Sequence, residues 1–539
     1  MLTSIRHWLD RNILELGREL RLSFLPPLMV YVAAGVSGLT GIVGTFFVKE
    51  HLGLSAAFLA ALGFWAGIPW ALKMPIGHLV DLIWRHKAAL VWLGAALIAG
   101  SLLIMYGLVT EPLRMGAIMS LEAWFVLSAL LAPVGYVIQD VVADAMTVEA
   151  VPRVDEHGQA VPAETRRLMN TTLQTLGRVA IIGGGVLVSV VNVLMFQGVE
   201  ALPQTAKIAV YAQVYGMALL IPLISVAGVL LASLLHRRDE RRLRARGFDE
   251  ARLQALLDPG VSPVRPNWWI LGGSGVFVAF SLSVGLAQLE FAQEIIFVGS
   301  FAIISFLMAR LLRELDEESR RTLLGTAIII FVFRAIPGPG AGSTWWMIDV
   351  LGFDQSFLAR LSLLASVLTL LGLFLFRRFM GERSIAHIVA FLTLAGTLLS
   401  LPTLGMYYGL HEWTAAHTGG IVDARFIALI DTALESPLGQ IAMVPMLAWI
   451  ANSAPAGLKA TYFAVMASFT NLALSASQLG TKYLNQIYHV SREVRDPTSN
   501  AVKVAADYGE LGSLFLTAIV LGLVLPFAAI WLTRLCRLR

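Results

Sequence analysis

Charged side chains are scarce in this chain of 539 residues. They make up 14% of it, where a soluble protein carries about 25%, while 57% of the residues are apolar. This balance excludes an ordinary soluble enzyme and predicts a protein whose solvent is largely lipid. Cysteine is nearly absent as well. The single Cys536 lies in the charged C-terminal tail, so it excludes an internal disulfide and gives no indication of an oxidising compartment.

Motifs for catalysis, metal binding and phosphate binding are also missing. The ten histidines do not pair at metal-ligand spacing, and no Ser or Cys lies in a nucleophile motif. Gly183, Gly184 and Gly185 lack the following Lys and Ser or Thr of a phosphate loop, so we assign them to close helix packing. The basic residues lie in short loops, which argues against nucleic-acid binding. We therefore expect no enzyme activity, no cofactor and no metal.

Long apolar stretches dominate what is present. Mean hydropathy is +0.73, and fourteen windows approach the roughly 20 apolar residues that a helix needs to cross a bilayer. We predict an all-α polytopic membrane protein with about fourteen transmembrane helices in contact with the lipid bilayer. The windows cover residues 24–48, 56–80, 88–109, 120–147, 169–196, 209–235, 268–290, 294–312, 322–347, 356–376, 384–408, 425–451, 459–487 and 511–533.

The distribution of basic residues predicts the orientation of the chain. Lys and Arg near the ends of spans are retained in the cytoplasm. If the N-terminus is inside, the inner loops and tails hold 28 Lys and Arg residues and the outer loops hold six. We therefore expect a multi-pass protein of the cytoplasmic (inner) membrane with both termini in the cytoplasm.

Loop composition divides the chain into five parts. Residues 1–23 carry seven charges and predict an amphipathic cytoplasmic segment, with a solvated start to the first span as the alternative. The longest polar segment, 236–267, contains eight arginines and three prolines, which indicates a basic cytoplasmic linker; binding of anionic lipid is the alternative. Six-helix bundles at 24–235 and 322–539 then flank this linker and an inserted transmembrane hairpin and loop at 268–321, as in transporters with repeated bundles.

Ionisable residues inside a membrane are costly unless they face a cavity or a partner. Lys73 lies in the second window between two prolines, where its charge suits an anionic solute. At the cytoplasmic end of this window, Asp81 and Arg85 are four residues apart. We predict that Asp81 and Arg85 gate the inner face by ion pairing.

The fourth window holds Gln139, Asp140 and Asp144. Because helical residues four apart share a face, the two carboxylates are neighbours and repel each other. This repulsion favours proton binding by one of them, so the pair is our candidate for proton coupling, with Arg178 of the fifth window as a nearby cation. The alternative is a structural charge cluster that Arg178 and Arg85 neutralise.

A helix-breaking segment follows Arg334 in the ninth window. Pro337 and Pro339 alternate with glycines there, and the backbone groups that they free must be satisfied by neighbours or by a water-lined cavity. We predict a discontinuous helix in which Pro337 and Pro339 contribute to gating and Arg334 is a further cation for the solute.

The twelfth and thirteenth windows add polar groups to the second half. Glu435 has two possible ion-pair partners, Arg425 and Lys482, and such a structural pair is as plausible as contact with a ligand. We include as candidates for solute binding or coupling the polar residues Asp431, Glu435, Gln440 and Asn471.

Four blocks of the chain together resemble the folate–biopterin transporter family of the major facilitator superfamily. They are residues 70–81, residues 139–149, residues 351–353 and, most specifically, residues 439–471. This resemblance implies a secondary active transporter that moves a pterin- or folate-like or other polar anionic solute by alternating access between two bundles. Together with the paired aspartates, it leads us to expect a proton-coupled symporter.

Two alternatives stay open. Residues 139–149 are also similar to a muropeptide permease of the same superfamily, and a photosynthetic-complex assembly factor shares its fold. The alternatives are therefore a transporter of another solute and a non-transporting membrane assembly factor.

Overall fold

The structure is a computed structural model of the chain. It describes residues 20–52, 54–71, 73–83, 86–151, 161–247, 268–286, 289–313, 316–376, 379, 383–439, 441, 459–495 and 502–538. All but the last four residues of the predicted N-terminal segment 1–23 lie outside the described residues.

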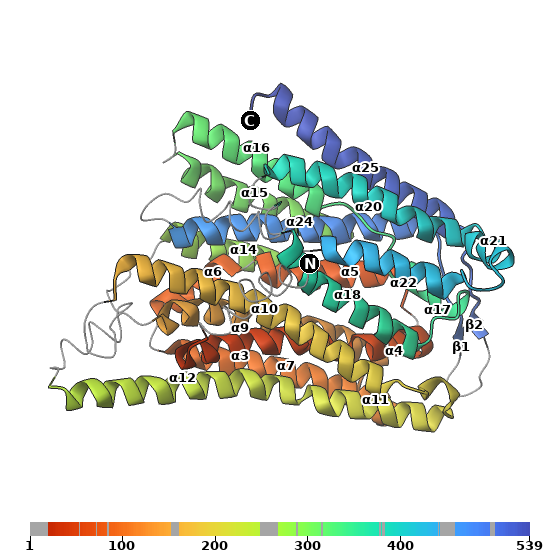
Figure 1. Ribbon diagram of the computed structural model, residues 1–539, viewed down its shortest axis with the longest axis horizontal. Helices are drawn as coiled ribbons and strands as arrows, with labels where there is room; N and C mark the ends of the chain where they lie inside the picture. The colour runs from red at the N-terminus through yellow and green to blue at the C-terminus, as the bar shows by residue number, and fades with distance from the viewer. Residues whose placement is uncertain are drawn as a thin grey trace, which may run out of the picture.

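Helices that run along a common axis make up most of the molecule (Figure 1). The apolar windows fold as helices because only internal hydrogen bonding satisfies the backbone in lipid. The helices of the first half are η2 (Leu22–Phe24), α3 (Leu25–Gly35), η3 (Val36–Thr40), α4 (Gly41–His51), α5 (Ala56–Ala71), α6 (Lys73–Leu82), α7 (Lys87–Thr110), α8 (Pro112–Ile118), α9 (Leu121–Ala150), α10 (Ala163–Met195), η5 (Val199–Ala201), α11 (Gln204–Ala218) and α12 (Leu220–Ala245).

The second half has the same character. A short antiparallel pair of strands connects its last two helices. Its elements are α14 (Trp268–Leu286), α15 (Ala292–Leu312), α16 (Glu317–Arg334), α17 (Ala341–Asp349), α18 (Gln355–Leu375), α20 (Ile385–Tyr407), α21 (Leu410–His417), α22 (Ala424–Glu435), η6 (Ser436–Leu438), α24 (Lys459–Ile487), β1 (Val494–Arg495), β2 (Val502–Val504) and α25 (Leu511–Leu535).

Nine helical stretches within the described residues are long and apolar enough to cross a membrane. They coincide with nine of the fourteen predicted windows. The other five windows also contain helix, but α5 with α6, α14, α16 with α17, α22 and α24 are shorter, interrupted, more polar or only partly described. The all-α membrane fold is confirmed, and the count of about fourteen spans stays a prediction.

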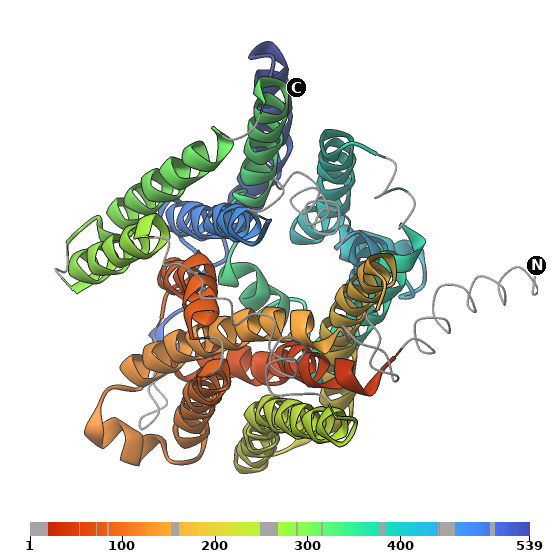
Figure 2. The same ribbon diagram turned by 90° about the vertical axis from the view of Figure 1, so that its left-hand side faces the viewer.

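Two helix pairs make the most extensive contacts between the described parts of the two halves: α5 packs against α24, and α10 packs against α18. The end-on view in Figure 2 shows helices of the first half on one side and those of the second half on the other. The hairpin α14–α15 lies outside the α5–α24 pair, in contact with α24 and α6. The division into five domains stays a prediction, although the largest described cluster of buried apolar side chains lies mainly in the first half and another lies in the second.

Glycines allow α3 to approach α10 closely. A Cβ on Gly184 would lie 2.8 Å from backbone atoms of Gly35, and a Cβ on Gly35 would overlap the carbonyl oxygen of Ile181. A Cβ on Gly183 would meet nothing within 4 Å. The predicted role of the glycine triplet in helix packing is therefore confirmed at Gly184.

The sixth window extends further than its hydropathy indicates. Helix α12 continues through Ala245, whereas the predicted linker begins at residue 236. Arginine is a good helix former, so the first ten residues of the predicted linker prolong the helix rather than end it. Residues 246–247 form a turn, and the remaining residues of the predicted linker, 248–267, lie outside the described residues.

Candidate functional site

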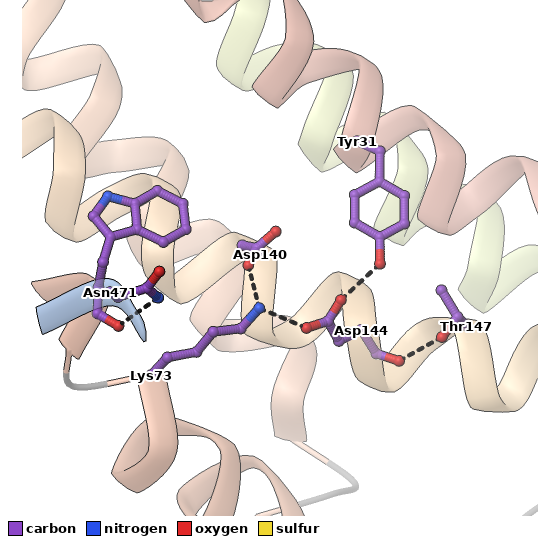
Figure 3. A network of polar contacts seen from close by, with 7 residues as sticks. Tyr31, Lys73, Asp140, Asp144, Thr147 and Asn471 are labelled. Atoms are coloured by element: carbon purple, nitrogen blue, oxygen red, sulfur yellow. Dashed lines mark hydrogen bonds and ion pairs between the residues drawn. The ribbon is translucent and has the colours of Figure 1, made fainter. Parts of the chain in front are cut away.

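Lys73 lies between the two aspartates of α9 in the first half of the molecule (Figure 3). Its Nζ is 2.6 Å from Oδ2 of Asp140 and 2.8 Å from Oδ2 of Asp144. The two carboxylates are one helical turn apart, which is why a single ammonium reaches both of them. The predicted proximity of Asp140 and Asp144 is therefore present, with a cation between them.

Tyr31 of α3 contacts the same cluster. Its hydroxyl donates a hydrogen bond of 2.7 Å to Oδ1 of Asp144, and the hydroxyl of Thr147 donates one of 2.6 Å to the backbone carbonyl of Asp144. The Asp144 side chain is still 42% exposed, compared with 17% for Asp140 and 19% for Lys73. Asp144 is thus the carboxylate that solvent or a solute can reach.

The charges of this cluster nearly balance. Two ionised carboxylates and one ammonium leave one net negative charge, and Arg178 of α10 interacts electrostatically with Asp140 and Tyr31. The predicted structural alternative assigned neutralisation to Arg178 and Arg85. In the structure Lys73 is the direct partner of both aspartates, and Arg85 lies outside the described residues.

Gln139 is used for packing inside the first half. Its side chain is buried, its Nε2 donates to the carbonyl of Val91 at 3.2 Å, and its Oε1 accepts from the hydroxyl of Ser225 at 2.9 Å. These bonds connect α9 to α7 and α12. The amide of Gln139 is therefore already bonded on the side of α9 away from Lys73.

Asn471 connects the cluster region to the second half. Its Nδ2 donates to the carbonyl of Trp70, three residues before Lys73, at 3.2 Å (Figure 3). Further along α24, Ser475 and Gln478 face glycines of α5, since a Cβ on Gly67 or Gly63 would crowd them. Polar side chains of α24, including the predicted candidate Asn471, therefore lie at the interface between the two halves.

The discontinuous helix predicted in the ninth window is confirmed. Helix α16 ends at Arg334 and α17 begins at Ala341, and Gly340 between them has a φ of 76°. Side chains of α24 satisfy the freed backbone groups. The hydroxyl of Ser477 donates to the carbonyl of Ile336 at 2.6 Å, and Nδ2 of Asn485 donates to the carbonyl of Pro339 at 3.2 Å.

The same contacts determine where the predicted gating prolines lie. The amide of Gly338 donates to the hydroxyl of Thr481 at 3.0 Å, and a Cβ on Gly480 would lie 3.0 Å from Pro337. Pro337 and Pro339 are therefore held against α24 within the second half. Their role in gating stays a prediction.

The remaining described candidates of the second half belong to α16 and α22. Arg334 is partly buried at the end of α16. The half-buried Asp431 faces the hydroxyl of Thr403 at 3.5 Å. Glu435 is exposed, and Gln440 lies outside the described residues.

The two predicted partners of Glu435 are bonded elsewhere. Arg425 contacts Asp354 at 3.0 Å, and Lys482 contacts Glu294 of the inserted hairpin at 2.9 Å. At the predicted inner gate, the structure describes the backbone of Asp81 in α6 but not its side chain, and Arg85 lies outside the described residues. The inner gate therefore stays a prediction.

Sequence reasoning missed Tyr31. It lies in a uniformly apolar span and contacts a residue 113 positions away, so no local pattern marks it. Within the described residues, no group of three or more His, Cys, Asp and Glu side chains is placed to hold a metal ion.

Comparison with known proteins agrees with this architecture. The model of the BT1 family matches residues 34–538. The chain is 23% identical over 475 residues to a "Folate-biopterin transporter" of Synechocystis sp., covering 87% of this chain and 76% of that protein. It is 26% identical over 167 residues to "Putative folate transporter 2" of Plasmodium berghei, covering 30% of this chain and 34% of that protein.

Solved structures show the same fold at low sequence identity. A POT family transporter crystallised with 5-aminolevulinic acid has a TM-score of 0.61 and 13% identity, and the match covers 95% of this chain and 96% of that one. The nucleoside transporter NupG has a TM-score of 0.53 and 11% identity, with 95% and 99% coverage.

Proposed function

The chain belongs to the BT1 family and is a multi-pass membrane transporter, and from this premise we propose that it carries a pterin- or folate-like or other polar anionic solute by alternating access. The names of two relatives, a folate-biopterin transporter and a putative folate transporter, support this solute class. The solute passes between the two halves of the molecule, along the interface where α5 packs against α24 and α10 packs against α18. The protein lies in the cytoplasmic membrane with both termini inside.

The observation that carries the mechanism is the bridging position of Lys73. Without solute, its ammonium is held by Asp140 and Asp144. Protonation of the more exposed Asp144 removes one of these two attractions, which leaves the ammonium able to turn toward an anionic solute. Proton binding and solute binding then favour each other, as symport requires.

Proton coupling fits these residues better than sodium coupling does. Transporters bind sodium with backbone carbonyls freed in broken helices. In this chain the carbonyls of Ile336 and Pro339 in the broken segment already accept hydrogen bonds from Ser477 and Asn485. We therefore assign coupling to the carboxylates of α9.

Uptake into proteoliposomes tests the solute class. Folate, biopterin and their analogues should enter or compete with one another for entry. If none of them does, the solute assignment is wrong, and competition by a muropeptide would support the permease alternative. If no solute of any class is driven by a gradient and a partner protein co-purifies stably, the assembly-factor alternative replaces transport.

Coupling is tested with Asp140→Asn and Asp144→Asn under a pH gradient and, separately, a sodium gradient. Both variants should lose proton-driven accumulation: Asp144→Asn cannot exchange the proton, and Asp140→Asn removes a charge that holds the ammonium of Lys73. The control is Glu111→Gln, which removes a carboxylate from an exposed ion pair with Arg114. Sodium-driven uptake that does not depend on pH would contradict proton coupling. Full proton-driven accumulation by the aspartate variants would contradict it as well, and either result would support a structural role for the aspartates.

A further inference from the structure

Arg492 is a buried cation outside the helices. It lies in the loop between α24 and α25, yet its side chain reaches the first half of the molecule and is only 2% exposed. Its guanidinium donates to the carbonyls of Val48 at 2.8 Å, Lys49 at 2.9 Å and Leu54 at 2.7 Å, and also to the carbonyl of Leu52. The guanidinium carbon lies 4.2 Å from the ring centre of Trp345.

These acceptors have a specific physical character. The last carbonyls of a helix lack intrahelical partners and carry the negative end of the helix dipole. Val48 and Lys49 belong to the last turn of α4, which ends at His51, and the carbonyl of Val48 also accepts a bond of 3.3 Å from the amide of Leu52. Arg492 therefore caps the C-terminal end of a helix in the opposite half, with the planar array of donors that suits several acceptors at once.

A second charge contact joins the same ends. The ammonium of Lys49 pairs with Asp349, the last residue of α17, and the hydroxyl of Tyr508 donates to the same carboxylate at 2.5 Å. Burial and the contact with Asp349 raise the pKa of Tyr508, so the phenol stays a donor at neutral pH. Burial lowers the pKa of Arg492 to about 10, which still leaves it charged at neutral pH.

The loop presents Arg492 in a defined position. Ser491 and Asp507 exchange two backbone hydrogen bonds of 2.9 Å, and β1 pairs with β2 directly after Arg492. The carboxylate of Glu510 also accepts a bond of 2.5 Å from the amide of His489. Because these contacts hold the loop to α24 and α25, movement of the second half carries Arg492 with it.

We propose that Arg492, together with the Lys49–Asp349 pair, forms an outer latch that holds the two halves shut at the end bearing residues 48–52 and 488–495. In this state the outer side is closed. Opening of that side requires the guanidinium to leave the end of α4, so Arg492 sets the balance between outward-closed and outward-open conformations. The inference rests on the alternating-access and orientation parts of the proposed function and not on the identity of the solute.

Other polar contacts between the halves agree with an outward-closed state. The side-chain amide of Gln355 donates to the hydroxyl of Tyr211 at 2.8 Å. Ser189 of α10 lies with its hydroxyl 3.0 Å and 3.2 Å from those of Ser362 and Ser366 of α18. Gln355 is the first residue of α18, Ser362 and Ser366 lie on either side of the midpoint of that helix, and the buried Ser189 lies near the C-terminal end of α10.

Labelling of a buried reporter tests the latch without any solute. Ser189→Cys is placed in a Cys536→Ser background and exposed to a membrane-impermeant maleimide from the outer side. Arg492→Ala should raise the labelling rate by roughly tenfold to a hundredfold, the effect expected from losing even one hydrogen bond to a charged group. Arg492→Lys, which retains the charge with fewer donors, should give an intermediate rate.

The chain offers a matched control in Arg425. This arginine also lies at the outer end, bonds a carbonyl and a carboxylate, and lies 5.2 Å from the ring centre of Phe357, but all of these partners are in its own half. Arg425→Ala should therefore leave the labelling rate unchanged. If Arg492→Ala is not recovered from the membrane, Arg492→Lys and Asp349→Asn carry the same test.

Two results would overturn the proposal. One is an unchanged labelling rate in the Arg492 variants, and the other is an equal rise in Arg425→Ala, which would indicate general loosening of the outer end. Failure of the solute assignment would leave the labelling result untouched. Intact uptake together with an unchanged labelling rate in the Arg492 variants would refute the latch and leave the transporter assignment standing.

Discussion

Replacement of Lys73 by glutamine is the sharpest perturbation of the candidate site. Oδ2 of Asp140 and Oδ2 of Asp144 contact the same nitrogen at 2.6 and 2.8 Å, so these oxygens are at most 5.4 Å apart, the sum of the two distances. Without the ammonium, two negative charges at that separation repel each other by about 3 kcal/mol or more at an effective dielectric constant of about 20.

That repulsion has a definite consequence for proton binding. About 3 kcal/mol corresponds to an increase of roughly 100-fold in the affinity of the carboxylate pair for one proton. The folded Lys73→Gln protein would then bind a proton more tightly than its unfolded chain, so its stability should rise as the pH falls. In the wild type, the ammonium of Lys73 contacts both carboxylates and offsets part of this repulsion, so the rise should be smaller.

Thermal melting in detergent at pH 8 and at pH 5.5 measures the effect. Lys73→Gln should melt well below the wild type at pH 8, and the difference should shrink at pH 5.5. Adding Asp144→Asn should restore stability, because it removes the repulsion. The exposed pair of Arg114 with Glu111 provides the control, and Arg114→Gln should change stability by about 0–1 kcal/mol.

Two outcomes would refute this reasoning. The first is a Lys73→Gln protein as stable as the wild type at both pH values, which would mean that the aspartates do not repel each other. The second is a Lys73→Gln, Asp144→Asn protein less stable than Lys73→Gln alone, because neighbouring charges that interact must show non-additive effects.

Three further predictions follow from packing, backbone satisfaction and orientation. Gly184→Leu should destabilise the protein by about 1–3 kcal/mol or more, because its side chain would meet the backbone of Gly35. Gly183→Leu, whose side chain would lie in open space, should melt close to the wild type. Equal effects of the two substitutions would contradict the packing role. Asn485→Ala should cost about 1–3 kcal/mol and speed hydrogen exchange around the broken helix, since it leaves the carbonyl of Pro339 without this donor; unchanged exchange would count against it. The exposed Cys536 should react with an impermeant maleimide in inside-out vesicles but not in intact cells, and the reverse result would invert the predicted orientation.

Much of the fold follows from local physics and was predictable. The apolar windows had to be helices because lipid offers no hydrogen-bond partners to the backbone. The break after Arg334 followed from proline and glycine, which cannot continue the helical bonding there. The shared face of Asp140 and Asp144 followed from the helical repeat alone.

The pairing of charges across helices was not predictable in the same way. Lys73 contacts Asp140 over 67 positions of sequence, and Tyr31 contacts Asp144 over 113. The sequence contains several cations that could pair with the aspartates, so Arg178 and Arg85 were reasonable predictions for their partners. Helical periodicity tells which residues share a face, but not which neighbouring helix that face meets.

The sequence by itself determined that this chain is a helical membrane protein of the transporter class, where it bends, and which of its helices carry polar faces. Tertiary structure alone decided that Lys73 bridges the two aspartates, that Gln139 turns away from them, and that Arg492 reaches the end of α4, more than 430 positions earlier. The physical reason is that hydropathy and periodicity act within one helix. Ion pairs and helix caps depend on how separate helices are rotated and packed, which only the folded chain specifies.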